Sequence, residues 1–296
     1  MKISILMVNY NTEQFIANFL QDLSIQTLTI DNYEIIITNN VQNNILKDIL
    51  DDLNLSQKLN IVIIQSEQNI GFGRAMNLAS EHAQGQHILI ANPDLRMMQT
   101  DYLEKLLAQA QIHTYGIITT QLINDLNEDK SEFYTFEFHE TFGWNNQTNW
   151  FSGALLLISK AVYQEVAGFD PDFFMYCEDE DLCLRIKKRG YPLIKLNELK
   201  IYHKGGASEP YQNYDFFFRW YKSQLLFAYK HFDETQFQKL IKRLLLKSKI
   251  KVIFYKLIFI LFPTARHRFQ YAQWSAMHDI VKKTLNESVD WLFFRI

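Results

Sequence analysis

The sequence predicts an α/β fold in which helices cover both faces of a mostly parallel β-sheet. Short, nearly all-apolar segments of strand length alternate with segments whose apolar residues recur at helical spacing. Strands buried on both faces of a parallel sheet have such continuous apolar runs, and helices usually connect them. The chain has 296 residues, enough for one large domain and an appendage.

The alternation starts at the N-terminus, where residues 3–8 are apolar and residues 13–23 place their apolar side chains on one face of a helix. We expect this unit to recur, with strands at 33–38, 60–65 and 87–91 and helices at 44–53 and 75–83.

The pattern continues beyond residue 100 with less regular spacing. We expect helix 101–111, strand 115–122, strand 150–158, helix 160–166, a helix from the acidic run 178–181 to Gly190, and a last pair of strands within 193–202. Residues 124–149 are polar and aromatic without a clear period, which indicates a long excursion over the site. From about Tyr211 the pattern is wholly helical, so we divide the chain into an α/β domain, 1–210, and a helical region, 211–296.

Composition excludes several classes of protein. Hydrophobic residues make up 48% and charged residues 21%, which is typical of globular proteins and argues against disorder, collagen-like repeats and a basic nucleic-acid-binding chain. Cys177 and Cys183 are too few for a disulfide framework and have no zinc-site spacing. The apolar run 3–8 is too short for a signal-peptide core, so we expect a chain that is not exported.

Charge is distributed unevenly. Residues 239–268 hold nine basic residues and no acidic one, which leaves 21 basic against 33 acidic residues in the rest of the chain. Such asymmetry indicates a polyanionic surface as partner.

Three common motifs are missing or incomplete. Gly71-Phe72-Gly73 lacks the third glycine of the dinucleotide fingerprint and follows the third expected strand, which argues against a nicotinamide cofactor. The chain has no P-loop for phosphoryl transfer and no G-x-S-x-G turn of a hydrolase.

Polar clusters follow the expected strands, at the edge where open α/β sheets bind ligands. Asn92-Pro93-Asp94 places a carboxylate there, and a hard divalent cation prefers such oxygen ligands together with phosphate oxygens. A β-turn with proline at its second position is the alternative explanation. His203 follows the last expected strand and becomes a metal-ligand candidate only if the fold brings it near Asp94.

Four consecutive carboxylates, residues 178–181, open a helix. Capping and a favourable interaction with the helix dipole explain one or two of them. Like charges this close raise one another's pKa, and a carboxylate with a raised pKa suits a general base. Arg185 can pair with Asp181 across one helical turn.

These clusters, in this order, resemble the family 2 glycosyltransferases, inverting nucleotide-sugar enzymes of the GT-A fold, and especially their bacterial rhamnosyltransferase-like branch. The matching segments cover about residues 1–210 and are 8–11, 69–77, 92–94, 153–154, 168–176, 178–185 and 203–208.

The resemblance implies roles for individual residues. Asp94 is then the last residue of a D-x-D-like motif, with Asn92 where Asp is frequent, and it binds Mg or Mn together with the donor diphosphate. His203 helps to hold this metal. Asp179 matches the catalytic base, and Glu178 lies on the acceptor side. The pocket for the acceptor and the donor sugar is bordered by Trp150, Gly153 and Ala154.

The resemblance also places the nucleotide. Tyr10 lies against the base, Val8 belongs to the nucleotide-sugar site, and the stretch from Gly71 and Phe72 to Asn77 lines the nucleotide side. The chain departs from the family after its second strand, where Asn39 replaces the Asp that reads a uracil or thymine imide N–H. Asn39 can still accept that hydrogen bond through its carbonyl oxygen.

The implied reaction is a single displacement with inversion, in which Asp179 takes the proton of an acceptor hydroxyl and a metal on Asp94 and His203 stabilises the leaving diphosphate. A deoxyhexose donor such as dTDP-rhamnose is preferred, with UDP-hexose or UDP-galactofuranose as alternatives. A catalytically inactive GT-A scaffold that acts as a binding module and a nucleotidyltransferase are the competing hypotheses.

The C-terminal region suggests a location. Residues 215–229 are densely aromatic, which is explained by packing under the catalytic domain. Residues 239–268 alternate apolar and basic side chains, as helices at an anionic membrane surface do; an RNA-binding face or a dimer contact is the alternative. The apolar stretch 252–262 has 11 residues, fewer than the ~20 that span a bilayer. We expect a cytoplasmic enzyme without nucleic-acid partner, peripheral at the inner face of the cell membrane, with a lipid-linked glycan as acceptor.

Overall fold

The computed structural model describes residues 2–136, 147–206 and 211–295. The chain forms two units: an α/β unit of residues Met1–Asp170 and Glu178–Ser208, and a helical unit of residues Pro171–Cys177 and Glu209–Ile296. Residues 137–146 of the expected excursion and residues 207–208 of the last family-like segment lie outside the described part.

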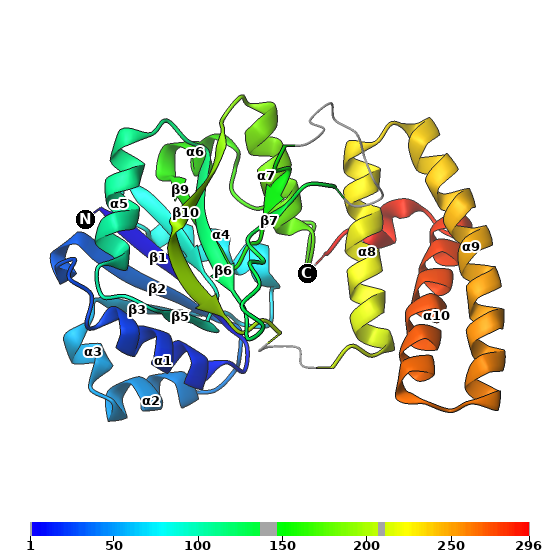
Figure 1. Cartoon of the computed structure of the whole chain (residues 1–296), viewed down its shortest axis with the longest axis horizontal. Coiled ribbons are helices and arrows are strands. Elements are labelled where there is room, and N and C mark those ends of the chain that lie inside the picture. The colour runs from blue at the N-terminus through cyan, green and yellow to red at the C-terminus, as the bar shows by residue number, and fades with distance from the viewer. Residues whose placement is uncertain (1, 137–146, 207–210, 296) are drawn as a thin grey trace. The chain divides into compact units, whose positions relative to one another are not determined.

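An eight-stranded mixed sheet forms the centre of the α/β unit (Figure 1). Its strands, in spatial order, are β3 (Ile61–Gln65), β2 (Tyr33–Asn39), β1 (Ile3–Asn9), β4 (His87–Ala91), β9 (Leu155–Ser159), β6 (Ile117–Ile123), β10 (Leu193–His203) and β5 (Leu95–Met97). The pairs β3–β2, β2–β1, β1–β4 and β6–β10 are parallel, whereas β9 runs antiparallel to β4 and β6, and β5 antiparallel to β10. The predicted α/β class with a mostly parallel sheet is confirmed.

Helices cover both faces of this sheet, as expected. One face packs against α1 (Glu13–Leu23), α2 (Ile45–Asp52), α3 (Leu55–Lys58) and α5 (Tyr102–Ile112). The other face packs against α4 (Phe72–His82), α6 (Lys160–Glu165) and α7 (Glu178–Lys188).

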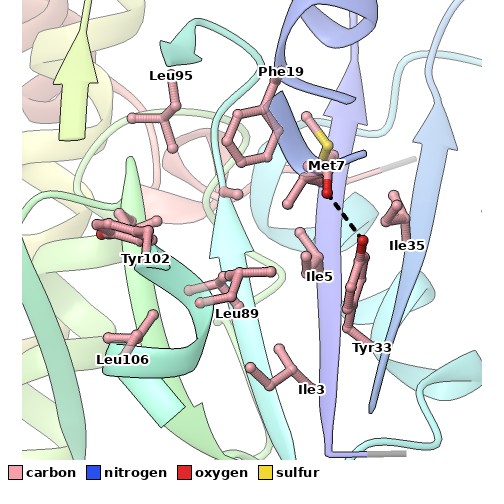
Figure 2. Packing of buried hydrophobic residues seen from close by; sticks show 14 of the residues in the cluster. Ile3, Ile5, Met7, Phe19, Tyr33, Ile35, Leu89, Leu95, Tyr102 and Leu106 are labelled. Atoms are coloured by element: carbon pink, nitrogen blue, oxygen red, sulfur yellow. Dashed lines mark hydrogen bonds between the residues drawn. The ribbon is translucent and has the colours of Figure 1, made fainter. Parts of the chain in front are cut away.

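Alternation along β1 explains how one strand serves both faces. Ile3, Ile5 and Met7 belong to the core under α1, and Leu6 and Val8 belong to the core under α4. Figure 2 shows the first of these cores around Ile5. Continuous burial therefore requires an apolar side chain at nearly every position, which is the pattern that the sequence has.

Three expectations about strands were wrong. Residues 150–158 form two strands, because the chain turns at 152–154 between β8 (Trp150–Phe151) and β9, and β8 pairs with β7 (Glu132–Phe133) in a separate sheet. The expected last pair of strands is the single strand β10, whose register shifts between Leu196 and Lys200. β3 is an edge strand, so Val62 and Ile63 are more than a third exposed instead of buried.

The helical unit consists of α8 (Tyr214–His231), α9 (Glu234–Leu261), α10 (Ala265–Asn286), a 3-10 helix (Val289–Leu292) and the segment 171–177. Asp233 and Gln236 form a capping box that begins α9, and Pro263 follows its end. In the part of the chain that the structure describes, no helix combines the length and the apolar character that crossing a membrane requires.

The position of an isoleucine in the sheet decides its contribution to stability. Ile5 in the central strand β1 is fully buried, and Ile63 in the edge strand β3 is 37% exposed. We expect Ile5→Ala to lower the free energy of unfolding by about 2–5 kcal/mol, because it leaves a cavity, and Ile63→Ala to lower it by about 1 kcal/mol or less. Urea unfolding of both variants measures the difference; equal losses would contradict this account of the core.

Candidate active site

The carboxyl ends of β1, β2 and β4 bring three asparagines to one edge of the sheet. Asn9 and Asn39 end neighbouring parallel strands and are paired in register. The Nδ2 atom of Asn9 donates to Oδ1 of Asn39 at 2.8 Å, and Asn92 directly follows β4. Because open α/β sheets bind ligands beyond the carboxyl ends of their strands, this edge is the candidate site.

Asn39 uses much of its hydrogen-bonding capacity inside the protein. It is 3% exposed, and its Nδ2 donates to Oε1 of Gln65 at 2.9 Å. Its oxygen, which the sequence predicts as the acceptor for a nucleobase, already accepts the bond from Asn9 and keeps one lone pair.

Asn40 is a candidate ligand residue that the sequence analysis missed. Its Nδ2 donates to Oδ1 of Asn69 and to the carbonyl oxygen of Gly71, each at 3.2 Å. Its Oδ1 is buried and accepts no hydrogen bond from the described residues. A buried acceptor without a donor is costly, so a bound ligand or water would stabilise it. Successive side chains along a strand point in opposite directions. Asn39 ends β2, so the sequence already indicated that the side chain of Asn40 points to a different side.

Four residues predicted for the nucleotide lie at or beside this edge. Val8 is buried near the end of β1, and Tyr10, the first residue after β1, is 42% exposed. Gly71 precedes α4 with φ +82°, a conformation that favours glycine, and Phe72 begins α4 with its ring 5.7 Å from that of Phe169.

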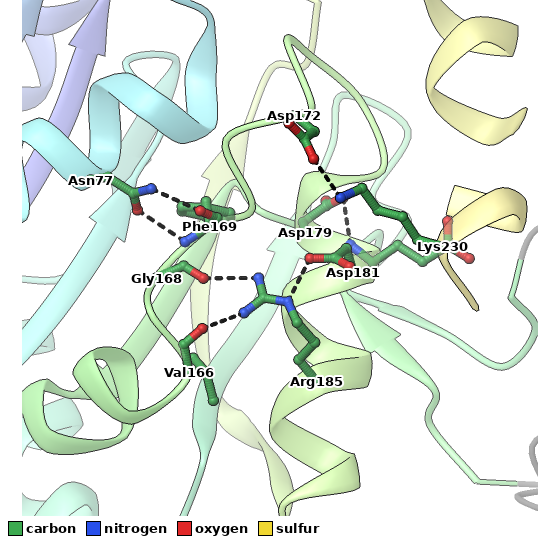
Figure 3. A network of polar contacts seen from close by, with 10 residues as sticks. Asn77, Val166, Gly168, Phe169, Asp172, Asp179, Asp181, Arg185 and Lys230 are labelled. Atoms are coloured by element: carbon green, nitrogen blue, oxygen red, sulfur yellow. Dashed lines mark hydrogen bonds and ion pairs between the residues drawn. The ribbon is translucent and has the colours of Figure 1, made fainter. Parts of the chain in front are cut away.

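Asn77, which is also predicted to line the nucleotide side, is hydrogen-bonded within the protein. Its Oδ1 accepts hydrogen bonds from the Tyr163 hydroxyl at 2.7 Å and the Phe169 N–H at 2.9 Å, and its Nδ2 donates to the Phe169 carbonyl at 2.7 Å (Figure 3). Three bonds on one amide fix α4 to α6 and to the loop that follows α6. Both polar atoms of the Asn77 side chain are therefore bonded within the protein.

Asn92-Pro93-Asp94 forms the β-turn of the alternative explanation, and this turn carries a buried carboxylate. The Leu95 N–H closes the turn on the Asn92 carbonyl at 3.4 Å, and Asp94 is 5% exposed. Leu95 is paired with His203 across β5 and β10. This register places Nε2 of His203 3.4 Å from Oδ1 of Asp94.

The surroundings of Asp94 keep it ionised. Burial raises the pKa of this carboxyl, but the hydrogen bond and charge of His203, with a backbone N–H of Gly205, outweigh burial and hold the pKa below its ordinary value. The carboxylate is therefore available as a ligand at neutral pH.

The donor set of Asp94 and His203 fits a divalent cation that is shared with a diphosphate. Carboxylate oxygen and imidazole nitrogen are both ligands for such ions. Across residues 2–136, 147–206 and 211–295, no group of three or more His, Cys, Asp or Glu could hold a metal by itself. Two protein ligands leave the remaining positions for phosphate oxygens and water, which is how Mg²⁺ commonly binds with phosphorylated ligands.

Asp179 is held by two backbone N–H groups at the start of α7. Its Oδ2 accepts from Gly153 at 2.8 Å and its Oδ1 accepts from Glu180 at 2.9 Å. Burial raises the pKa of Asp179, and these two hydrogen bonds counteract the rise. A Cβ at position 153 would lie 3.1 Å from Cβ of Asp179, so glycine allows this close approach.

Gly153 and Ala154 connect the two candidate parts of the site. The Asn92 N–H donates to the Ala154 carbonyl at 2.9 Å, while the Gly153 N–H holds Asp179. Adjacent residues thus link the turn that carries Asp94 to the carboxylate of Asp179.

Glu178 is a buried acid at the start of α7. It is 7% exposed, and its Oε2 has no hydrogen-bond partner within the described ranges. Burial and then the charge of Asp179 raise the pKa of Glu178 to about 8, so its carboxyl carries a proton at neutral pH.

Arg185 holds the loop beside this acidic helix. The expected pair is confirmed, since its Nε lies 2.7 Å from Oδ2 of Asp181. The same guanidinium donates to the carbonyls of Val166 at 2.7 Å and Gly168 at 2.8 Å, contacts that the spacing of α7 could not predict (Figure 3). Asp181 is therefore structural.

Trp150 presents an ordered aromatic surface on the small sheet. Its ring stacks on Phe133 with centroids 3.9 Å apart, and its Nε1 donates to the Thr135 carbonyl at 3.0 Å. Phe133 was missed in the sequence because it lies in the aperiodic excursion.

Comparison with known proteins assigns this architecture. The model of the family described as Glycosyl transferase family 2 matches residues 4–178. Rhamnosyltransferase WbbL of Escherichia coli (strain K12) is 25% identical over 247 residues, 73% of this chain and 88% of that protein. The N-acetylglucosaminyl-diphospho-decaprenol L-rhamnosyltransferase of Mycobacterium tuberculosis (strain CDC 1551 / Oshkosh) is 37% identical over 54 residues, 18% of each chain.

A solved structure shows the same fold. The mannosyltransferase PcManGT from Pyrobaculum calidifontis, in complex with GDP-Man and Mn²⁺, superposes with a TM-score of 0.60 at 13% identity and covers 96% of this chain and 87% of its own. The chain therefore belongs to glycosyl transferase family 2: it has the GT-A fold and is a hexosyltransferase-like enzyme that takes its sugar from a nucleotide sugar.

Proposed function

We propose that the chain is an inverting, metal-dependent glycosyltransferase that moves rhamnose or another hexose from a nucleotide diphosphate to a hydroxyl of a lipid-linked glycan in cell-surface polysaccharide biosynthesis. The link Asn92–Ala154–Gly153–Asp179 carries the proposal, since it joins a candidate diphosphate site to a candidate base. Inversion in one step needs these two functions on opposite sides of one anomeric carbon.

On the donor side, the nucleotide lies along the edge formed by β1, β2 and the start of α4. Tyr10 offers its half-exposed ring to the base, and Asn40 offers its unpartnered oxygen to a donor group of the base or ribose. Asp94 and His203 would hold Mg or Mn, which when bound offsets the negative charge of the diphosphate. The complex of PcManGT with GDP-Man and Mn²⁺ supports this assignment.

On the acceptor side, Asp179 takes the proton of the attacking hydroxyl. The N–H groups of Gly153 and Glu180 orient its carboxylate, and burial makes it a stronger base than an exposed aspartate. Glu178, protonated at neutral pH, adds no second negative charge and can donate a hydrogen bond to the acceptor. Trp150 provides a flat apolar surface against which a sugar ring can pack.

The relatives favour a rhamnosyl donor and a lipid-linked acceptor. WbbL is a rhamnosyltransferase, and the mycobacterial relative is named for a diphospho-decaprenol acceptor. Both dTDP and UDP fit this site, because thymine and uracil present the same imide N–H to the remaining lone pair of Asn39 Oδ1.

We place the reaction at the inner face of the cell membrane because of the surface of α9. Seven apolar side chains of this helix are at least half exposed: Leu246, Ile250, Ile253, Phe254, Leu257, Ile260 and Leu261. At about 100° per residue they share an arc of roughly 120°.

Lysines flank this apolar arc on both sides. Lys249 and Lys256 lie along one flank, and Lys247 and Lys251 along the other, where each ammonium is within 6 Å of the Trp274 ring centroid. Apolar side chains between two rows of cations match an anionic bilayer surface, where the apolar groups enter and the cations meet the headgroups.

Asp179→Asn tests the base. We expect transfer to fall by at least about 100-fold, because no group takes the proton, while donor affinity stays within about two-fold. Turnover and donor binding are measured with dTDP-rhamnose and UDP-hexoses, with Asp52→Asn, an exposed residue of α2, as control. A variant that keeps more than about a tenth of wild-type turnover would remove Asp179 from this role. A wild-type protein that binds donor and neither transfers nor hydrolyses it would support the inactive scaffold.

Glu178 makes stability depend on pH. Its folded pKa of about 8 lies above the ordinary 4.5, so the stability it contributes is full below pH 4.5 and is lost as pH rises through 8. Glu178→Gln does not lose stability in this way, because its amide does not titrate. Relative to wild type, we expect this variant to gain on the order of 2 kcal/mol of unfolding free energy between about pH 5 and about pH 9. Urea unfolding across this range measures it, with the exposed Glu81→Gln as control, and parallel profiles for wild type and Glu178→Gln would exclude the raised pKa.

Vesicle flotation tests the membrane surface. We expect wild type to float with vesicles that contain phosphatidylglycerol and to remain unbound with phosphatidylcholine alone, while Ile250→Gln/Leu257→Gln binds at least about 10-fold more weakly. Ile112→Gln, at a 70% exposed site on α5, is the matched control. Unchanged flotation of the double variant would contradict the proposal, and a loss of dimer mass in sedimentation would indicate a contact between copies instead.

A further inference from the structure

A cavity in the helical unit combines cationic and apolar side chains and has no part in the chemistry described above. Its volume is about 210 Å³. It is lined by residues of the segment 172–175, of α8 and of the C-terminal stretch 292–294, all of which belong to the helical unit.

The wall formed by the segment 172–175 is fixed at both ends. The Phe294 N–H donates to the Asp172 carbonyl at 2.9 Å, and the Ser223 hydroxyl of α8 donates to the Met175 carbonyl at 2.7 Å. Nζ of Lys230, two turns further along α8, lies 2.6 Å from Oδ2 of Asp172. Hydrogen bonds and an ion pair therefore join the segments that form the cavity.

The lining carries positive charge. Arg219 and Lys222 lie three residues apart on α8 and so share one face of it. Asp172, the acidic residue of the lining, is neutralised by Lys230.

A third cation, Lys283, stands close to Lys222 and is paired with Glu287 at 3.8 Å. The ammonium of Lys283 lies 4.6 Å from the Trp291 ring, and that of Lys222 lies 5.7 Å from the same ring. Burial, and then the charge of Lys283, lowers the pKa of Lys222. Neighbouring cations that are partly desolvated are stabilised when an anion binds between them.

The rest of the lining is apolar. Phe174, Met175, Leu292 and Phe294 contribute to it, and the rings of Phe174 and Phe294 are 4.7 Å apart. Cations beside aromatic and aliphatic walls match a ligand in which an anionic group is joined to a hydrocarbon chain.

We propose that this cavity binds the diphosphate of a prenyl-diphosphate-linked glycan, with the first prenyl carbons against its apolar wall. The inference rests on the proposed function, since such a molecule is the acceptor class assigned there. Arg219 would bind phosphate oxygens through its planar guanidinium, and Lys222 would add a charged hydrogen bond. Along the chain, the lining segment 172–175 precedes the proposed base Asp179 by four residues.

The double variant Arg219→Gln/Lys222→Gln tests the site. With saturating donor, we expect KM for the prenyl-diphosphate acceptor to rise at least about 10-fold, because charged hydrogen bonds are lost, with kcat within about two-fold. KM for the same glycan on a neutral alkyl aglycone should not change. Lys47→Gln/Lys58→Gln, two exposed lysines of α2 and α3, controls for net charge. An equal rise for both acceptors, or no rise, would overturn the proposal.

Binding of inorganic pyrophosphate separates the site from the reaction. Calorimetry should detect binding to the wild-type chain, at least about 10-fold weaker binding to the double variant, and competition with the prenyl-diphosphate acceptor. Competition by phosphatidylglycerol vesicles but not by pyrophosphate would assign the cavity to a phospholipid headgroup and reject a diphosphate. Pyrophosphate binding without any transfer or donor hydrolysis would refute the proposed function and leave the anion site standing.

Discussion

Carboxylates buried at one edge of the sheet are the constraint on which the site depends. A buried charge is costly unless it is paired or hydrogen-bonded, and each acid here meets that requirement differently. The pKa of Asp94 is lowered because His203 and a backbone N–H face it, and Asp181 forms an ion pair with Arg185. Asp179 accepts hydrogen bonds from two backbone N–H groups. One oxygen of Glu178 has no hydrogen-bond partner among the residues that the structure describes, and Glu178 keeps its proton to a pH of about 8.

These differences give neighbouring acids different chemistry. A carboxylate stabilised by opposite charge is a good metal ligand and a weak base, whereas a partly buried carboxylate held by backbone N–H groups is a stronger base. The strand register determines which acid is which. β5 pairs Leu95 with His203 and so brings an imidazole to Asp94, and the antiparallel strand β9 places the Gly153–Ala154 turn between Asn92 and Asp179.

Charged side chains in the helical unit are also distributed according to their surroundings. Basic residues concentrate where apolar side chains are exposed on α9 and where α8 borders a cavity, while Asp172 is neutralised by Lys230. Both features place cations beside hydrocarbon surface, which is complementary to the charge and the chain of an anionic lipid. The proposed membrane surface and the proposed diphosphate site therefore both suit an amphiphilic, lipid-linked acceptor.

The sequence by itself determined the α/β class, the bounds of α1 and β4, and the segments from which the site is built, because those depend on apolar periodicity and on turn residues within a few positions of one another. The identity of Asp94, His203 and Asp179 as candidates came from motifs in family order. Only the tertiary structure decided which of these residues are in contact, as His203 and Asp94 are. The split of residues 150–158 into two strands, the pairing of β5 with β10, the internal bonds of Asn39 and Asn77 and the unpartnered oxygen of Asn40 all depend on contacts between residues far apart in the chain. Local spacing carries no information about such contacts, and burial, which sets the pKa of each acid, exists only once they have formed.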